Sequence, residues 1–281
     1  MIIAKTISEV RAARWAHPEL SWGLVPTMGY LHEGHLSLAR HARAENDRVA
    51  ATIFVNPTQF APNEDLSTYP RALERDLAML EQDNVDLVFT PTDEVMYPPD
   101  FQTEVHLARV TKPLEGSSRP THFIGVATVV AKLFNIVQPT RAYFGQKDAQ
   151  QSVVLRQMVR DLNFNLELIV CPIVRESDGL ALSSRNKYLN PAQRQAATVL
   201  NRALRAAETA VSLGERSGSA IRQLMHGIIT AEPLARLDYV SAADPQTLAE
   251  LDEIENGVLL STAVFIGATR LIDNILIKGK K

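Results

Sequence analysis

Two histidines three residues apart, His32 and His35, stand in a short segment that also holds Gly29 and Gly34. The segment follows the apolar run 22–26 and precedes residues with the spacing of a helix. Unpaired N–H groups at the start of a helix favour anions, and glycines allow a ligand to approach the backbone closely. The residues therefore predict a phosphate-binding turn with two imidazoles beside it.

Two other interpretations of this histidine pair stay open. The rings can serve as turn residues or helix caps. The i, i+3 spacing also suits two ligands of one zinc ion, but no nearby Cys or further His offers an obvious third ligand. Neither Gly-x-Gly-x-x-Gly nor Gly-x-x-x-x-Gly-Lys-Ser/Thr occurs here, so a dinucleotide fingerprint and a Walker-type loop both lack support.

Neutral amides follow the next strand-like run, in the segment Phe54 to Phe60. Asn56 and Gln59 supply donors and acceptors that suit the hydroxyl or carboxylate oxygens of a small ligand. The Asn-Pro dipeptide also favours a turn, which is the structural alternative.

Two further segments offer positive charge. Lys147 lies where a strand-like run meets a helix and can place its charge on a phosphate. Asp148 and Gln151 in the same segment also fit a helix capping box. The polar run Leu182 to Asn186 offers hydroxyls and the guanidinium of Arg185 to a polyphosphate, although alone it resembles a linker.

The elements that must position these segments alternate between strand and helix over about the first 175 residues. Strands are expected at 22–26, 48–55, 85–90, 142–144 and 166–174, and helices at 35–45, 71–82, 123–137 and 149–162. The helix at 123–137 places six apolar residues on one face, from Val126 to Val137. Repeated strand–helix units build a parallel sheet, and ligands of such sheets sit beyond the carboxyl ends of the strands.

After Val174 the pattern changes, which predicts a domain boundary at 176/177. Helices are expected at 192–211 and 221–229, and strands at 235–240, 258–266 and 272–277. The chain is therefore predicted to form an α/β domain over residues 1–176 and a smaller α+β domain over 177–281. The serine-rich run 182–186 falls at this junction, where a hinge-borne cation could close over a nucleotide.

Composition narrows the classes of function. The 281 residues are 46% hydrophobic and 22% charged, with 29 Lys+Arg against 32 Asp+Glu and a net charge of −3. Such a chain is globular and lacks the basic excess expected of a protein that binds long nucleic acids.

The single cysteine, Cys171, lies in an apolar run and is expected to be a small buried hydrophobe. No signal peptide is evident, and the longest uncharged apolar run, 257–268, is shorter than the roughly 20 residues of a membrane span. We expect a cytoplasmic protein that contacts neither membrane nor nucleic acid.

The His-x-Gly-His sequence resembles the HIGH motif of class I nucleotidylyl transferases and aminoacyl-tRNA synthetases. The segments Val25 to His35, Phe54 to Phe60, Tyr143 to Asp148 and Leu182 to Asn186 together resemble the pantothenate synthetase family, the pantoate–β-alanine ligases. The resemblance runs in order from residue 25 to about 190. Only the C-terminal third lacks a specific motif.

This resemblance implies a Rossmann-like parallel sheet with helices on both faces, and a ligase that uses ATP with Mg²⁺. ATP and pantoate would form pantoyl-adenylate and pyrophosphate, and the β-alanine amine would then release AMP and give pantothenate. The family's ATP-binding positions correspond to Met28, Gly29, Tyr30, Leu31, His32, Glu33, Gly34, His35, Gly145, Gln146, Lys147, Asp148, Val174, Leu182, Ser183, Ser184 and Arg185. His35 would be the catalytic residue, and Gln59, Gln151 and Asn56 would bind substrate.

The resemblance also implies a homodimer, and it leaves the protein ligands of the metal unknown. Asp76 could touch magnesium, although a solvated helix carboxylate is the simpler interpretation. Gln146 replaces the glutamate usual in the family. The alternatives are another HIGH-motif nucleotidylyltransferase and a non-catalytic nucleotide sensor or RNA-binding relative.

Overall fold

A computed structural model describes residues 1–61 and 64–279 of the chain. The chain forms two compact units, each described by itself. The first comprises Met1–Gly145 and Val154–Pro172, and the second comprises Gln146–Val153 and the chain from Ile173 onward.

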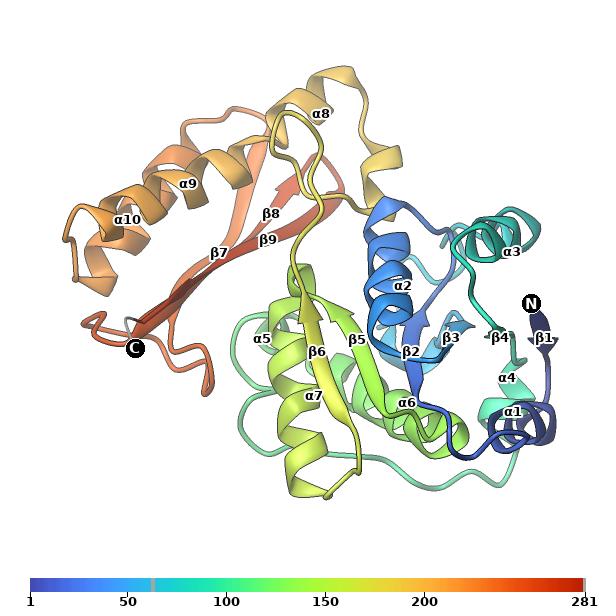
Figure 1. Cartoon of the computed structure of the whole chain (residues 1–281). Coiled ribbons are helices and arrows are strands. Elements are labelled where there is room, and N and C mark those ends of the chain that lie inside the picture. The colour runs from blue at the N-terminus through green and yellow to red at the C-terminus, as the bar shows by residue number, and fades with distance from the viewer. Residues whose placement is uncertain (62–63, 280–281) are drawn as a thin grey trace. The chain divides into compact units, whose positions relative to one another are not determined.

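The first unit is built on a six-stranded parallel sheet with the order β1-β4-β3-β2-β5-β6 (Figure 1). Its strands are β1 (Ile2–Ala4), β2 (Trp22–Thr27), β3 (Arg48–Ile53), β4 (Leu87–Phe89), β5 (Arg141–Gly145) and β6 (Glu167–Cys171). From β2 the chain passes outward to β3 and β4, then returns to β5 on the other side of β2. The order of strands thus reverses between β2 and β5, the point at which open α/β sheets bind ligands.

Helices cover both faces of this sheet, as the sequence predicted. They are α1 (Ile7–Trp15), α2 (Glu33–Glu45), α3 (Leu73–Gln82), α4 (Asp93–Met96), α5 (Glu115–Ser118), α6 (His122–Val137) and α7 (Ala149–Asp161), with the 3₁₀ turn η1 (Pro57–Gln59). Tyr143 of β5 packs in one apolar cluster with α2 and α3. The next residue, Phe144, contacts Phe134 of α6 with ring centroids 6.4 Å apart. Successive strand residues point to opposite faces, so α2 and α6 lie on opposite sides of the sheet.

The apolar face of α6 is buried within the single chain. All six residues of the predicted stripe, from Val126 to Val137, are less than 9% exposed, so core packing accounts for the pattern. Cys171 is likewise buried, and burial raises the pKa of its thiol to about 11. A thiol protonated at neutral pH is a poor nucleophile, which confirms its interpretation as a small buried hydrophobe.

The second unit holds an antiparallel sheet formed by β7 (Ala235–Ala243), β8 (Gly257–Ile266) and β9 (Thr269–Lys278). Its other elements are η2 (Gln146–Asp148), η3 (Ser184–Tyr188), α8 (Pro191–Ala196), α9 (Val199–Ser212) and α10 (Gly218–Thr230). One apolar cluster joins Leu204 of α9, Met225 of α10 and Leu260 of β8. The strands and helices predicted after residue 177 are therefore present, with one exception.

The exception is the helix expected at 192–211, which is two helices separated by a turn at 197–198. The hydroxyl of Thr198 donates to the carbonyl of Gln195 at 2.8 Å, and its backbone N–H donates to the same oxygen at 3.2 Å. Threonine hydroxyls compete in this way with helical hydrogen bonding. The Ala-rich composition of residues 192–211 favours a continuous helix and gives no sign of the turn at 197–198.

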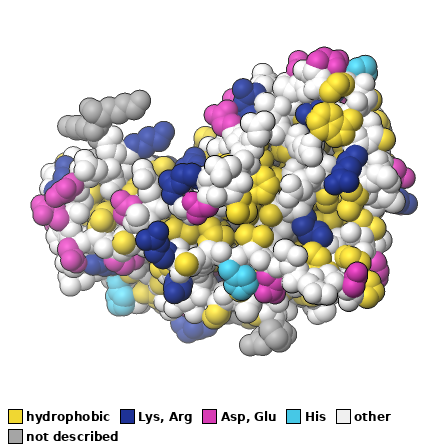
Figure 2. Space-filling model, turned by 90° about the horizontal axis from the view of Figure 1, so that it is seen from below, with side chains coloured by type: hydrophobic (Ala, Val, Ile, Leu, Met, Phe, Trp, Pro, Cys, Tyr) yellow, Lys and Arg dark blue, Asp and Glu magenta, His cyan; other side chains and the backbone are white. Residues whose placement is uncertain are grey.

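No helix among the described residues is long and apolar enough to cross a membrane. On the face drawn in Figure 2, Lys and Arg side chains are interspersed with Asp and Glu.

Candidate active site

The segment Met28–His35, here called the histidine turn, connects β2 to α2. Its second and third residues have left-handed backbone, with φ of +81° at Gly29 and +50° at Tyr30. A Cβ at Gly29 would lie 3.0 Å from Ile53 Cγ2 and 3.2 Å from Asp76 Oδ2. The turn and its packing therefore require glycine, whereas the sequence had suggested ligand approach as the reason.

Both histidines cap the helix that follows. Nδ1 of His32 accepts from the backbone N–H of Gly34 at 3.2 Å, and Nδ1 of His35 accepts from the N–H of His32 at 3.3 Å. The two ring centroids are 4.1 Å apart. An accepting Nδ1 carries no hydrogen, so each neutral ring carries its hydrogen on Nε2. The capping role and a ligand role thus use different nitrogens of the same ring.

Asp76, on the first turns of α3, holds the histidine turn from outside it. Its carboxylate is fully buried and accepts from the N–H groups of Tyr30 at 2.6 Å and Leu31 at 2.9 Å. The neighbouring Arg75 donates to the Leu31 carbonyl at 3.1 Å and lies over the Tyr30 ring. The interpretation of Asp76 as a solvated helix carboxylate is wrong, because the side chain is fully buried. The left-handed turn directs two backbone N–H groups toward α3, and the carboxylate accepts from both of them.

Gln59 lies beside the histidine turn, where its Nε2 donates to Met28 Sδ at 2.9 Å. Its Oε1 accepts from Nδ2 of Asn56 at 3.2 Å. Asn56 is only 1% exposed, and its Oδ1 accepts from the hydroxyls of Tyr97 at 2.7 Å and Thr58 at 3.0 Å. Asn56 therefore orients the Gln59 amide.

The backbone of Gln59 is held by two residues that motif reasoning did not find. His122, at the start of α6, donates from Nδ1 to the Gln59 carbonyl at 2.9 Å. Arg119 donates to the same carbonyl at 3.4 Å and forms an ion pair with Glu64. Burial, and then the charge of Arg119, lower the pKa of His122 to about 4. Its ring is therefore neutral at physiological pH. No motif around residues 119–122 signals this support.

The second unit holds the other predicted ATP-binding residues except Gly145. The turn η2, Gln146–Asp148, is here called the lysine segment. Lys147 is half-buried, with its Nζ 3.7 Å from the Asp148 carboxylate. Gln151 follows on the first turn of α7 and is also half-buried. Gly145, the last residue of β5, belongs to the first unit.

The segment Leu182–Asn186, here called the serine loop, follows a short antiparallel stem in which residues 174–175 face residues 181–182. In the stem, Arg175 pairs with Ala181, and Leu182 donates to the carbonyl of Val174 at 3.0 Å. Ser183 Oγ accepts from the N–H of Arg185 at 3.2 Å and so caps η3. The structure thus places Val174 at the base of the loop that carries Ser183, Ser184 and Arg185.

The predicted residues therefore divide between the two units. In the first unit, the histidine turn and Gln59 are in direct contact. The second unit contains the lysine segment, Gln151, Val174 and the serine loop. Within the first unit, the strands β2 and β5 are parallel neighbours and end at the same edge of the sheet.

Carboxylates do not gather into a metal site in this structure. Among the described residues, no group of three His, Cys, Asp or Glu could hold a metal ion.

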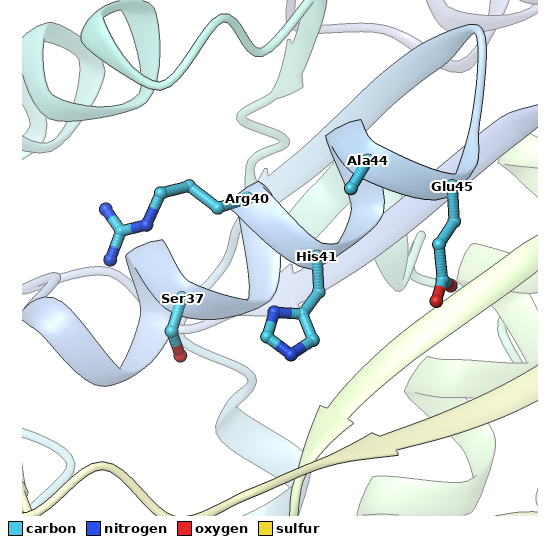
Figure 3. A pocket seen from close by; sticks show the side chains of 5 residues that line it. All are labelled: Ser37, Arg40, His41, Ala44 and Glu45. Carbon is cyan, nitrogen blue, oxygen red and sulfur yellow. The ribbon is translucent and has the colours of Figure 1, made fainter.

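A pocket of about 340 Å³ on α2 contains none of these residues (Figure 3). It is lined by Ser37, Arg40, His41, Ala44 and Glu45, which share one exposed face of the helix. Arg40 in this pocket forms ion pairs with Glu33 and Asp83. The pocket is therefore a hollow between surface side chains and separate from the site described above.

Comparisons with known proteins agree on one family. The model of the pantoate–beta-alanine ligase family matches residues 2–276. The pantothenate synthetase of Roseiflexus sp. strain RS-1 is 61% identical over 99% of this chain and 100% of its own length. That of Moorella thermoacetica is 56% identical over 99% of both chains.

Solved structures give the same result. A pantothenate synthetase from Thermus thermophilus superposes with a TM-score of 0.93 at 48% identity, covering 98% of this chain and 99% of that one. A pantoate–beta-alanine ligase from Francisella tularensis, complexed with beta-gamma ATP and beta-alanine, superposes with a TM-score of 0.80 at 37% identity. The coverage in that case is 98% of this chain and 97% of the other.

Proposed function

The chain belongs to the pantoate–beta-alanine ligase family, and on this premise we propose that it joins pantoate to β-alanine in two steps driven by ATP. In the first step, a pantoate carboxylate oxygen attacks the α-phosphorus of ATP, and pyrophosphate leaves. In the second step, the β-alanine amine attacks the acyl carbon of pantoyl-adenylate, and AMP leaves as pantothenate forms. A carboxylate is a poor acyl donor until adenylation gives it a leaving group, so no nucleophile from the protein is needed.

The observation that carries this proposal is the hydrogen bonding of the histidine turn. Because His32 and His35 both accept at Nδ1, their Nε2 atoms are hydrogen-bond donors in the neutral rings. Donors at the carboxyl end of β2 suit the negative charge that moves onto the departing phosphates. We assign His35 as the catalytic residue of adenylation, acting as a donor at Nε2.

The amide of Gln59 is proposed to bind pantoate. Asn56 fixes its Oε1, which directs Nε2 toward Met28 and makes the amide a donor to a substrate oxygen. Gln151 is proposed as a second pantoate ligand. The Francisella relative is complexed with beta-gamma ATP and beta-alanine, which supports ATP and β-alanine as substrates of this chain.

The lysine segment and the serine loop are proposed to bind the phosphates. Lys147 would supply a point charge and Arg185 a planar guanidinium, a difference that matters most as charge develops on pyrophosphate. We propose that residues 177–281 act as a lid domain that carries the serine loop. Mg²⁺ would accompany ATP and neutralise phosphate charge when bound.

An assay of AMP release tests the reaction class. AMP should form rapidly only when ATP, pantoate and β-alanine are all present, and pantothenate should form in equal amount. Adenylate formation alone should appear as pyrophosphate released in a single turnover with ATP and pantoate. AMP formation at a rate that does not depend on β-alanine would instead favour another nucleotidylyltransferase. A nucleotide product in place of AMP would favour the same alternative.

A homodimer in the cytoplasm is proposed on the family relationship alone. The apolar face of α6 does not support the dimer, since it is buried within one chain. Light scattering at micromolar concentration should give twice the mass of 31.1 kDa, and a monomer mass would reject the dimer.

A further inference from the structure

The strand β9, in the part of the chain without a recognised motif, carries Asp273 and Asn274 at adjacent positions. The side chain of Asn274 is buried, and all of its described hydrogen bonds go to the lysine segment. Its Nδ2 donates to the carbonyls of Gln146 at 3.0 Å and Lys147 at 2.8 Å. Its Oδ1 accepts from Nε2 of Gln146 at 2.9 Å. One amide therefore fixes both the backbone and a side chain of this segment.

The adjacent Asp273 holds the stem of the serine loop. Its carboxylate is 3% exposed and forms two parallel hydrogen bonds with Arg175, at 2.7 and 2.9 Å. The same guanidinium donates to the carbonyls of Gly179 at 3.0 Å and Asn274 at 3.3 Å. A buried ion pair is tolerated when its remaining polar atoms are satisfied, and here the extra bonds reach both the stem and β9.

We propose that Asp273 and Asn274 are positioning residues for ATP, which set the lysine segment and the serine loop relative to each other. The inference rests on the proposed function, because it assumes that Lys147 and Arg185 bind phosphates. Its basis is that two neighbouring residues of β9 hold two different segments, each of which lies far from β9 in the sequence. Asn274 is 127 residues from Lys147, and Asp273 is 98 residues from Arg175.

Accurate placement matters at these segments because both proposed ligands act through charge. A carbonyl at Lys147 that lost its donor would let the segment turn, and the ammonium group would move with it. Displacements of about 1 Å near reacting groups can cost about 100-fold in rate. A purely structural pair would instead lower stability and leave the response to ATP unchanged.

The test compares Asn274→Ala with a matched control, Thr262→Val. Thr262 pairs with Asp273 in the same sheet, is equally buried, and donates to the backbone carbonyl of Tyr239 at 3.0 Å. Each variant thus loses buried side-chain hydrogen bonds to backbone carbonyls in this unit. Steady-state kinetics would give KM for ATP and for β-alanine, single-turnover pyrophosphate release would give the adenylation rate, and thermal melts would report stability.

We expect Asn274→Ala to raise KM for ATP or lower the adenylation rate by about 10- to 100-fold, with KM for β-alanine within about twofold of wild type. Thr262→Val should leave all three kinetic parameters unchanged, even if its melting temperature falls equally. If Asn274→Ala does not fold, Asn274→Asp keeps the side-chain size while it replaces the donor with an acceptor, and the same kinetics apply.

An unchanged adenylation rate and KM for ATP in a folded Asn274 variant would overturn the positioning role. Equal kinetic losses in Thr262→Val would also overturn it, because they would show a general effect of destabilisation. Failure of the proposed function is distinguishable from failure of the positioning role. In that case the wild-type protein itself would release no pyrophosphate from ATP and pantoate.

Discussion

The histidine turn is held by two adjacent residues of α3, whereas two adjacent residues of β9 hold the lysine segment and the stem of the serine loop, and the two pairs use different chemistry. In the first unit, the carboxylate of Asp76 accepts from backbone N–H groups while Arg75 donates to a carbonyl. In the second unit, the amide of Asn274 donates to backbone carbonyls. The carboxylate of Asp273 holds the stem of the serine loop through Arg175.

The difference shows which groups each segment retains for a ligand. At the histidine turn, the N–H groups of Tyr30 and Leu31 are engaged by Asp76, and that of Gly34 by His32. Backbone donors that the sequence had offered to a phosphate are thus used by the protein, and in the proposed function the imidazole Nε2 atoms serve as donors in their place. In the lysine segment the carbonyls are engaged instead, which removes acceptors that would repel a phosphate. Both pairs therefore leave an environment that favours negative charge.

The largest effect is expected from His35, and paired substitutions separate its two roles. His35→Ala should slow adenylate formation at least about 100-fold, the scale for loss of a positioned donor or proton-transfer group. His35→Asn can keep an acceptor near the position of Nδ1, so it should preserve the cap while losing Nε2. Single-turnover pyrophosphate release should therefore fall in both variants. Near wild-type rates in the asparagine variant would reduce His35 to a helix cap.

The next largest effect is expected at Asp76. In Asp76→Asn one amide N–H group would face a backbone N–H of the turn, which costs about 1–3 kcal/mol when buried. We expect the free energy of unfolding to fall by this amount and adenylation to slow by about 10-fold or more. Chemical denaturation and single-turnover assays measure the two effects. Solvated Glu74, on the same helix turn, supplies the control as Glu74→Gln, which should change neither.

A smaller and more specific effect is expected in the second unit at Arg185. Charge accumulates on the departing pyrophosphate, whereas ATP in the ground state can satisfy its oxygens with Mg²⁺ and water. Arg185→Ala should therefore lower kcat by more than it raises KM for ATP, provided that adenylation limits turnover. Lysine should rescue only in part, since its ammonium cannot make a two-pronged contact. An unchanged kcat with a raised KM would make Arg185 a ground-state ligand.

The smallest effect on stability is expected at Gly145, in contrast with Gly29. A Cβ at Gly145 would meet no atom of the described residues within 4 Å, whereas one at Gly29 would be crowded and strained. Gly29→Ala should cost about 1–2 kcal/mol of stability, and Gly145→Ala should stay within about 0.5 kcal/mol of wild type. Denaturation curves compare the two. If Gly145→Ala is stable yet binds ATP more weakly in calorimetry, a ligand approaches the chain at that glycine.

The sequence could predict the segments of the site because their signals are local. The histidine turn and the lysine segment each follow a strand-like run and precede a helix, and this pattern predicts a position at the carboxyl edge of a parallel sheet. Sequence patterns also predicted most elements and the parallel direction of the first sheet. The strand β1 and the helix α1 were not anticipated, and the break between α8 and α9 lay inside a helical composition with no glycine or proline to mark it.

The sequence by itself determined which residue types stand at the ends of the strands, and through their resemblance which family the chain belongs to. Only the tertiary structure decided how those residues are held. Asp76 lies 46 residues from Tyr30 in sequence, and as an acidic residue in the first turn of a helix it matches a common surface pattern. Asp273 and Asn274 stand in a strand whose apolar neighbours give no sign of a distant partner. Periodicity and spacing report interactions between near neighbours in the chain, whereas these hydrogen bonds exist only because folding brings separate segments together.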